Sequence, residues 1–379
     1  MIVKTRLNRL ISAPGAVYAT GLKEGCLNHA ATGVVAPQPV RHGRAGGSET
    51  YAALDLGTNN CRLLVARPSS DGFRVIDAFS RIVRLGEGLG ARGSLSEEAI
   101  ERSIRALRVC AVKMRRRGVG VARCVATEAC RRAANATSFV QRVAEETGVA
   151  LEVISSNEEA RLAVSGCAPL LTGDARHALI FDIGGGSTEL TWVRRTSLGG
   201  IEVLGVASFP CGVVTLSEVY GGDSYDEATY EAMVAEVERQ ILPFEKAYGL
   251  SQAIAEGGVQ MLGTSGTVTT LAGVLMGLPR YDRARVDGTW LDFNHIADIC
   301  LQLRSLDCEG RAAHPCIGRD RADLVVAGCA VLEAICRNWQ VGRVRVADRG
   351  VREGILYSLM RGESVAIPTL NGGASYRTH

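Results

Sequence analysis

Two short segments of the sequence combine an aspartate with glycines and small polar residues, the residue types needed to bind phosphate with a metal ion. Residues 55–59 read Asp-Leu-Gly-Thr-Asn, and residues 182–189 read Asp-Ile-Gly-Gly-Gly-Ser-Thr-Glu. Glycine lets the backbone turn with positive φ and approach an anion closely, so that its N–H groups can donate to it. Asp55 and Asp182 supply the carboxylate oxygen that a hard cation such as Mg²⁺ prefers.

A third glycine-containing segment, residues 263–267 (Gly-Thr-Ser-Gly-Thr), precedes a predicted helix, whose dipole also favours phosphate at its N-terminus. A single glycine-rich hairpin is often a plain tight turn, but three in this order indicate phosphate binding. The residues expected to contact phosphate through backbone, hydroxyl or amide groups are Asn59, Gly184, Gly185, Gly186, Ser187, Thr188, Gly263, Ser265 and Gly266.

The elements that must position these segments occur in the same order twice. Apolar runs and alternation predict a strand, a tight turn and a second strand over 51–66, and the same arrangement again from residue 178. The remaining strands are expected at 73–83, 121–126, 150–154, 201–208, 259–262 and 344–347. The helices are expected at 96–114, 136–147, 157–166, 226–247, 293–305, 320–338 and 350–361.

This repetition predicts an α/β fold of two duplicated domains with a cleft between them. In such sheets, ligands bind outside the carboxyl ends of the strands, where the glycine segments are expected. The predicted division is domain I at 50–167 and domain II at 168–362, with a flexible tail at 363–379. Residues 1–49 are rich in glycine, alanine and proline and lack a hydrophobic period, so they predict a disordered extension.

Composition narrows the class of protein. The 379 residues are 46% hydrophobic and 22% charged, which suits two globular domains. Lys and Arg number 43 against 40 Asp and Glu, so neither a stable nucleic-acid partner nor a membrane partner is expected. The basic extension is predicted to be a solvated tail, with a weak nucleic-acid or membrane contact as the alternative. The 12 cysteines form no CxxC pair and predict free thiols in a reducing cytoplasm, where we expect the protein to reside.

The three segments, together with residues 157–161 (Asn-Glu-Glu-Ala-Arg), resemble the exopolyphosphatase/guanosine pentaphosphate phosphatase (Ppx/GppA) family. Supporting matches lie at 84–89, 126–135 and 346–354, and the resemblance runs from about residue 51 to 361. The most specific match is 182–189, because actin-like kinases lack its Ser-Thr-Glu ending. The family belongs to the acetate kinase/sugar kinase/Hsp70/actin superfamily, which implies two actin-like, ribonuclease H-like domains. The chain resembles the short members of the family, without the helical C-terminal domains of the long exopolyphosphatases.

The resemblance also implies roles for individual residues. Glu159 matches the catalytic base, and Glu189 matches a second acidic residue that orients water or the metal ion. Asp182 resembles the metal-linked aspartate, and Asp55 its partner across the cleft. Arg131 matches an arginine whose planar fork binds phosphate oxygens.

Other interpretations of these residues stay open at this point. Glu159 could simply offset the dipole of its helix, and Arg131 could be an ordinary surface arginine. Glu158 is expected to be structural or to face solvent, and Glu87 is a weaker candidate near the mouth of the cleft. Asp348, Arg349 and Gly350 are expected to brace the second domain rather than to touch substrate.

The resemblance implies a phosphoanhydride hydrolase that depends on Mg²⁺, or on Mn²⁺ in its place. It would release terminal phosphate from inorganic polyphosphate, from guanosine pentaphosphate (pppGpp), or from both, with guanosine tetraphosphate as a further ligand, and it is expected to be a homodimer. The alternative is an ATP-dependent kinase or an Hsp70-like nucleotide-binding regulator on the same fold. Glu159 and Glu189 favour hydrolysis, because carboxylates suit the activation of water.

Overall fold

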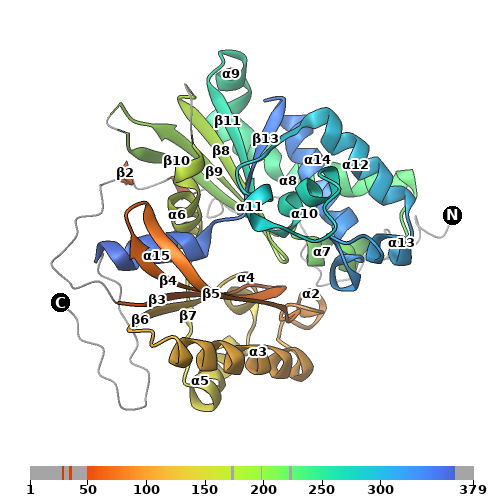
Figure 1. Cartoon of the computed structure of the whole chain (residues 1–379). Coiled ribbons are helices and arrows are strands. Elements are labelled where there is room, and N and C mark those ends of the chain that lie inside the picture. The colour runs from red at the N-terminus through yellow and green to blue at the C-terminus, as the bar shows by residue number, and fades with distance from the viewer. Residues whose placement is uncertain are drawn as a thin grey trace.

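The computed structural model describes the chain from residue 49 to residue 362 with three short gaps, and it adds the backbone of two strands nearer the N-terminus. The described ranges are 49–171, 175–197, 199–221 and 224–362, with the pairing of 28–29 and 34–35. Two α/β halves, each with its own sheet, lie on either side of a central pair of helices (Figure 1). The predicted fold class, two actin-like α/β domains, is confirmed.

The sheet of the first half has five strands in the order β5-β4-β3-β6-β7. β3, β4 and β5 pair antiparallel, whereas β6 and β7 run parallel to β3. The strands are β3 (Tyr51–Leu56), β4 (Asn60–Ser69), β5 (Gly72–Ile82), β6 (Val121–Ala126) and β7 (Glu152–Val153). The helices of this half are α2 (Leu89–Arg92), α3 (Glu97–Arg116), α4 (Glu128–Arg132) and α5 (Ala136–Thr147).

Helix α3 shows how the sequence pattern produces this packing. Ser96 caps it, since its hydroxyl accepts a hydrogen bond from the Ala99 N–H at 3.2 Å. The predicted apolar face is confirmed: Ile100, Ile104 and Leu107 are buried against the sheet. Each such side chain contributes about 1.5–3 kcal/mol when it is fully buried, so the apolar face, rather than helix propensity, fixes α3.

The sheet of the second half has the strand order β1-β10-β9-β8-β11-β13-β12, with β2 also pairing with β10. Its strands are β1 (Asn28–His29), β2 (Val34–Val35), β8 (His177–Ile183), β9 (Thr188–Arg195), β10 (Ile201–Phe209), β11 (Val259–Thr264), β12 (Trp290–Asp292) and β13 (Arg343–Ala347). Its longer helices are α7 (Val213–Tyr220), α8 (Glu227–Tyr248), α10 (Ser265–Leu275), α12 (Phe293–Ser305) and α14 (Val325–Asn338). Its short helical turns are η1 (Ala168–Leu170), α9 (Leu250–Ala255), α11 (Arg283–Val286), α13 (Cys308–Ala312) and η2 (Arg319–Arg321).

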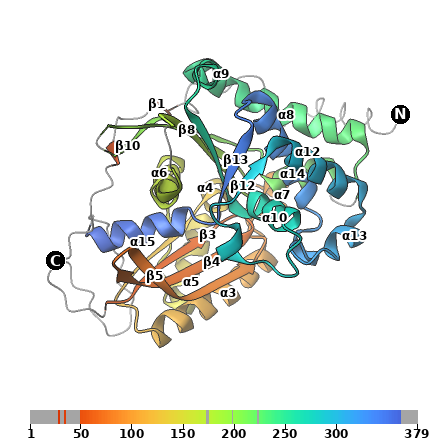
Figure 2. The same ribbon diagram turned by 45° about the horizontal axis from the view of Figure 1, so that its top comes forward.

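Helices α6 (Ser156–Cys167) and α15 (Val351–Arg361) lie between the two sheets, as both views show (Figures 1 and 2). One face of α6 packs against the second sheet through Ala160 and Val164. Its other face shares a core with α15 and the first sheet. The two helices meet at glycines: a Cβ on Gly166 would lie 2.0 Å from the carbonyl oxygen of Gly350. A larger residue there would push α6 away from the start of α15.

The final helix therefore packs on the first sheet although it follows the last strand of the second. The predicted domain boundary between residues 167 and 168 stays a prediction. A single boundary in the sequence does not anticipate α15, which belongs to the C-terminal part of the chain but packs on the first sheet. The disorder predicted for 1–49 and for 363–379 concerns segments that lie almost entirely outside the described residues.

The eleven described cysteines are free thiols, ten of them buried. In the described part of the chain, no helix is both long and apolar enough to cross a membrane.

Candidate active site

A cleft opens between the halves where the β3–β4 turn faces the β8–β9 turn. Both turns stand at strand ends, as predicted, and the β11–α10 junction joins them. The predicted site residues that line the cleft are Asp55, Asn59, Glu159, Asp182, Gly184, Gly185, Gly186, Ser187, Glu189, Ser265 and Gly266. Segments far apart in the sequence thus meet in one place.

The glycines of the β8–β9 turn allow close contact between the halves. A Cβ on Gly185 would lie 3.1 Å from the Cβ of Asn59, and one on Gly186 would lie 2.8 Å from the Thr58 hydroxyl oxygen. None of these glycines has a positive φ, so the expectation that they are needed for that conformation is wrong. They are needed because the two turns approach each other more closely than side chains permit.

Positive φ occurs instead at Ser265, which follows β11 and has φ 82°. Its hydroxyl donates to the carbonyl oxygen of Ile183 at 2.5 Å and so ties the β11–α10 junction to the β8–β9 turn. A non-glycine residue in this conformation costs about 1–3 kcal/mol and persists only where its surroundings hold it. The strain marks this junction as part of the site.

Glu159 lies in the first turn of α6, which begins after the N-cap Ser155. Its side chain is 15% exposed, and its Oε2 accepts a hydrogen bond from Arg131 Nη1 at 2.7 Å. Arg131 also pairs with Glu128, at 2.9 Å, and donates to the carbonyl oxygen of Ile154. Burial raises the pKa of Glu159 well above its usual value, the nearby Glu189 raises it further, and Arg131 opposes both.

Arg131 is not among the residues that line the cleft, because its guanidinium lies among the carboxylates of Glu128 and Glu159. It is accordingly a partner of Glu159, and its predicted role as a phosphate clamp stays a prediction. Glu158 points elsewhere and pairs with Arg123, in agreement with a structural role.

Three further carboxyl groups face the cleft. Burial raises the pKa of Asp182 to about 6 and that of Glu189 to about 7, and the charge of Asp182 contributes to the second shift. Two hydroxyls hold Glu189 Oε1: Ser187 donates at 2.5 Å and Ser208 at 2.8 Å. Burial also raises the pKa of Asp55, although Arg352 and Arg62 lower it in part. Like charges held together in a buried site favour a cation among them.

Among the described residues, no three side chains of Asp, Glu, His or Cys are grouped so that they could hold a metal ion by themselves. Mg²⁺ rarely uses an all-protein cage; it keeps several waters and binds one or two carboxylates together with substrate phosphates. Asp55, Asp182 and Glu189 offer carboxylates of that kind around the cleft. The donor set therefore fits a magnesium ion that arrives with its substrate.

Two predicted phosphate-binding residues lie behind the cleft wall. Thr188 is fully buried, and its hydroxyl donates to the carbonyl oxygen of Cys211 at 2.9 Å. Gly263 lies in β11, where a Cβ would come within 2.5 Å of the Phe181 ring. Glu87 also lies outside the cleft and pairs with Arg102 at 2.6 Å.

The structure adds three arginines that the sequence analysis did not single out: Arg62, Arg321 and Arg352 line the cleft. Asp348, Arg349 and Gly350, which were expected to brace the second domain, also lie in the cleft wall. One signal could have indicated Arg62: pairing of the predicted hairpin places it opposite Asp55 in the β3–β4 register. Arg321 and Arg352 come from distant elements, and only the fold brings them here.

A comparison with models of protein families shows to which family this chain belongs. The model of the Ppx/GppA phosphatase family matches residues 64–363. The chain belongs to the Ppx/GppA phosphatase family. The supporting sequence resemblance is thus confirmed over most of the chain.

Solved structures of Ppx/GppA proteins have the same fold. The Aquifex aeolicus member of the family is 28% identical to this chain, with a TM-score of 0.68, and the match covers 84% of this chain and 99% of that one. An exopolyphosphatase-like protein is also 28% identical, with a TM-score of 0.75 and coverages of 82% and 97%. An exopolyphosphatase from Cytophaga hutchinsonii has a TM-score of 0.75 at 24% identity, with coverages of 83% and 98%, which shows the shared fold.

Proposed function

We propose that this Ppx/GppA phosphatase is a phosphoanhydride hydrolase that releases terminal phosphate from inorganic polyphosphate, from pppGpp, or from both. The observation that carries the proposal is the convergence of the buried Glu159 carboxyl with the two glycine turns in one cleft. Hydrolysis of a phosphoanhydride needs an aligned water, a base beside it, and groups that stabilise negative charge. The cleft offers candidates for each of these.

Glu159 acts as the general base in this proposal. Burial and Glu189 make its carboxylate a stronger proton acceptor than one in water, while Arg131 fixes its orientation through the 2.7 Å hydrogen bond. A positioned base of this kind contributes about 10²–10⁴-fold to turnover. Arg131 would then serve as a positioning residue for Glu159.

The turn residues would bind the phosphate group that is transferred to water. The backbone N–H groups of Gly185, Gly186 and Ser187 donate no hydrogen bond within the described residues, so they can donate to phosphate oxygens. The side-chain carbonyl oxygen of Asn59 is buried without a partner, and as an acceptor it suits a water or a cation that accompanies the phosphate. Its amide N–H group is the part that can donate to a phosphate oxygen.

Asp55, Asp182 and Glu189 would hold Mg²⁺, or Mn²⁺ in its place, together with the substrate. When bound, the ion neutralises charge on the phosphate oxygens. Removal of one carboxylate, by Asp182→Asn or Glu189→Gln, should lower activity and raise the Mg²⁺ concentration required. Variants that titrate with Mg²⁺ like the parent would place the ion elsewhere.

Related proteins favour polyphosphate as the first substrate to test, since two of the similar solved structures are an exopolyphosphatase and an exopolyphosphatase-like protein. The decisive experiment supplies purified protein and Mg²⁺ with polyphosphate, pppGpp or ATP and follows released phosphate. Release from either of the first two supports the proposal. An ATP-specific reaction that needs a second acceptor would support a kinase and overturn the proposed hydrolase activity.

A cytoplasmic location and a homodimeric state are further parts of the proposal. Cell fractionation tests the location, and light scattering tests the oligomeric state.

A further inference from the structure

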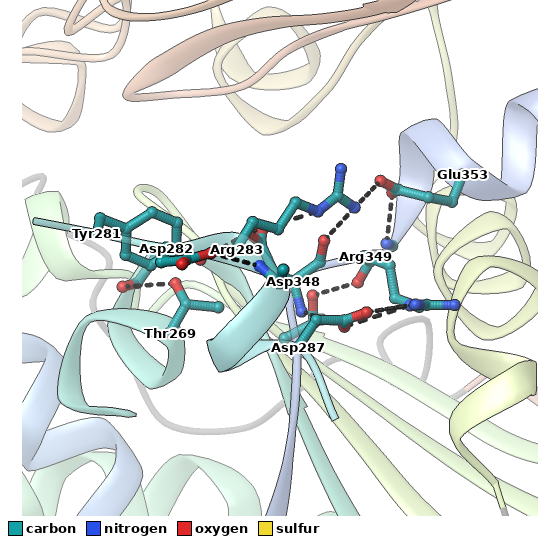
Figure 3. Close-up of polar contacts among 12 residues, drawn as sticks. Thr269, Tyr281, Asp282, Arg283, Asp287, Asp348, Arg349 and Glu353 are labelled. Carbon is teal, nitrogen blue, oxygen red and sulfur yellow. Dashed lines mark hydrogen bonds and ion pairs between the residues drawn. The ribbon is translucent and has the colours of Figure 1, made fainter. Parts of the chain in front are cut away.

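The segment Asp348–Glu353 links β13 to α15 and forms part of the cleft wall, and nearly all of its charges are paired (Figure 3). Asp348 Oδ2 accepts from the Tyr281 hydroxyl at 2.6 Å. Glu353 accepts from the Gly350 N–H at 2.8 Å and from Arg283 at 2.6 Å. These contacts hold the start of α15 against the second half of the molecule.

The next charged residue of the segment, Arg349, is paired as well. Its Nε donates to Asp287 Oδ2 at 3.0 Å, and a second nitrogen of its guanidinium also contacts that carboxylate. The Asp348 N–H donates to the other Asp287 oxygen at 3.0 Å. Three of the four charged residues in the segment are therefore fixed by partners.

Arg352 is the exception. It lines the cleft, and its guanidinium makes neither a hydrogen bond nor an ion pair with any described residue. Its electrostatic neighbours across the cleft are Arg62, which repels it, and Asp55, which attracts it without forming an ion pair. Burial lowers its pKa and Arg62 lowers it further, whereas the nearby carboxylates of Glu353, Asp55 and Asp348 oppose this shift without bonding to the guanidinium.

A partly buried guanidinium without a hydrogen-bond partner is costly, because hydrogen bonds must replace the water that it has lost. The surrounding network could have supplied a carboxylate, but it uses Asp348, Asp287 and Glu353 on other groups. Arg62 is likewise without an ion pair among the described residues, so two positive side chains face one cleft. A bound anion with several oxygens would supply the counter-charge and the hydrogen-bond acceptors that these two arginines lack.

We propose that Arg352 is a substrate-binding residue whose guanidinium donates to phosphate oxygens of the bound phosphate chain, held in position by the paired charges around it. The inference rests on the proposed function, since it assumes a phosphate substrate in this cleft. A planar guanidinium can bind two phosphate oxygens at once, and such charge-assisted bonds are about twice as strong as neutral ones. The fixed segment presents the side chain without further ordering.

The test compares Arg352→Met and Arg352→Lys with Arg361→Met, a matched control at the far end of the same helix, where the arginine lies over the Tyr357 ring. Melting temperatures are measured with and without inorganic tripolyphosphate, in the absence of divalent cations so that no turnover occurs. Phosphate release from tripolyphosphate is then followed with Mg²⁺.

The proposal expects Arg352→Met to melt at the temperature of the parent or above it, because the variant loses a charge that has no partner. The variant should lose most of the stabilisation by tripolyphosphate, and its KM should rise about 10- to 100-fold. Arg352→Lys should fall between parent and Met variant, because lysine keeps the charge but lacks the fork. Arg361→Met should bind and hydrolyse like the parent.

Three results would overturn the proposal. A Met variant that melts well below the parent, with its response to tripolyphosphate intact, would give Arg352 a structural role. A parent that binds and hydrolyses tripolyphosphate while both Arg352 variants match it would remove Arg352 alone and leave the proposed function standing. A parent that neither binds tripolyphosphate nor releases phosphate from any member of the substrate panel would overturn the proposed function, and this inference with it.

Discussion

The charges of the cleft and those of the network beside it are compensated differently, although both regions include residues of the segment 348–353. The network consists of Tyr281, Arg283, Asp287, Asp348, Arg349 and Glu353. In the network, each charged group has an opposite partner: Arg283 with Glu353, and Arg349 with Asp287. In the cleft, Asp55, Asp182 and Glu189 face one another, and each has a raised pKa. Paired charges hold a segment in place. Like charges that face a cavity destabilise the fold until a bound ligand compensates them. The contrast separates the scaffold from the site.

The largest expected effect in the cleft follows from Glu159→Gln. Gln keeps the shape but cannot accept the proton, so turnover should fall by about 10²–10⁴-fold while the fold is retained. The measurement is phosphate release at saturating substrate, with circular dichroism to confirm folding and Glu158→Gln as the neighbouring control. Unchanged turnover would remove Glu159 from the mechanism.

In the network, the largest effect should follow from Glu353→Ala. Its side chain is 4% exposed, and its loss leaves Arg283 and the Gly350 N–H without their acceptor. Because the Arg283 side chain is 38% exposed, water can replace part of the lost acceptor, so the variant should lose about 1–3 kcal/mol of stability. Thermal or denaturant unfolding measures this loss. Glu309→Ala, which removes an exposed ion pair with Arg319, is the control and should cost less than about 1 kcal/mol. Similar losses in both variants would erase the distinction between scaffold and surface.

Unlike Glu353→Ala, the substitution Asp182→Asn is expected to stabilise the fold when divalent cations have been removed. Because burial raises the pKa of Asp182 to about 6, the folded carboxylate is unfavourable at pH 8, and the amide should stabilise the fold by about 1 kcal/mol, or roughly 2–4 °C. The gain should shrink as the pH falls through about 6 and vanish below about pH 4, where the folded and the unfolded protein both carry the protonated carboxyl. Melting curves of parent and variant at pH 8 and pH 4 test this. A destabilised variant at pH 8 would mean that Asp182 belongs to the scaffold.

A smaller effect is expected where the halves meet at the mouth of the cleft. Arg84, with φ 46°, pairs with Asp323 through bonds of 2.8 and 3.0 Å. The two side chains are 33% and 29% exposed, so solvent screens the pair, and its coupling should be about 0.5–1 kcal/mol. A double-mutant cycle with Arg84→Ala and Asp323→Asn measures it. A coupling above about 2 kcal/mol would show that this pair holds the halves together.

The smallest effect should follow from deletion of residues 1–48. The described cores of both halves start at residue 50 or later, and the contact of the deleted segment that the structure describes is the pairing of two short strands with β10. Turnover on short substrates and the melting temperature should therefore change little. Loss of activity on truncation would place part of the site in the extension.

The secondary structure that could be predicted from the sequence consists of elements with a clear period. Helices α5 and α12 begin and end at the predicted residues, and β6 also has its predicted bounds. Short elements such as α4, α7 and β12 were not predicted, because helices of five and eight residues complete too few turns, and a strand of three residues too few alternations, to show a pattern. This omission matters for the site, since α4 carries Arg131.

The sequence by itself determined the two Asp-x-Gly hairpins, the duplicated α/β plan and the family, because each depends on residues that are neighbours in the chain. Only the tertiary structure decided what those residues meet. It paired Arg131 with Glu159, packed the glycines of one turn against Thr58 and Asn59, and left Arg352 without a partner in the cleft. It also returned α15 to the first sheet. The reason is that burial, close approach and charge compensation depend on groups tens or hundreds of residues apart, and local patterns carry no record of those distances.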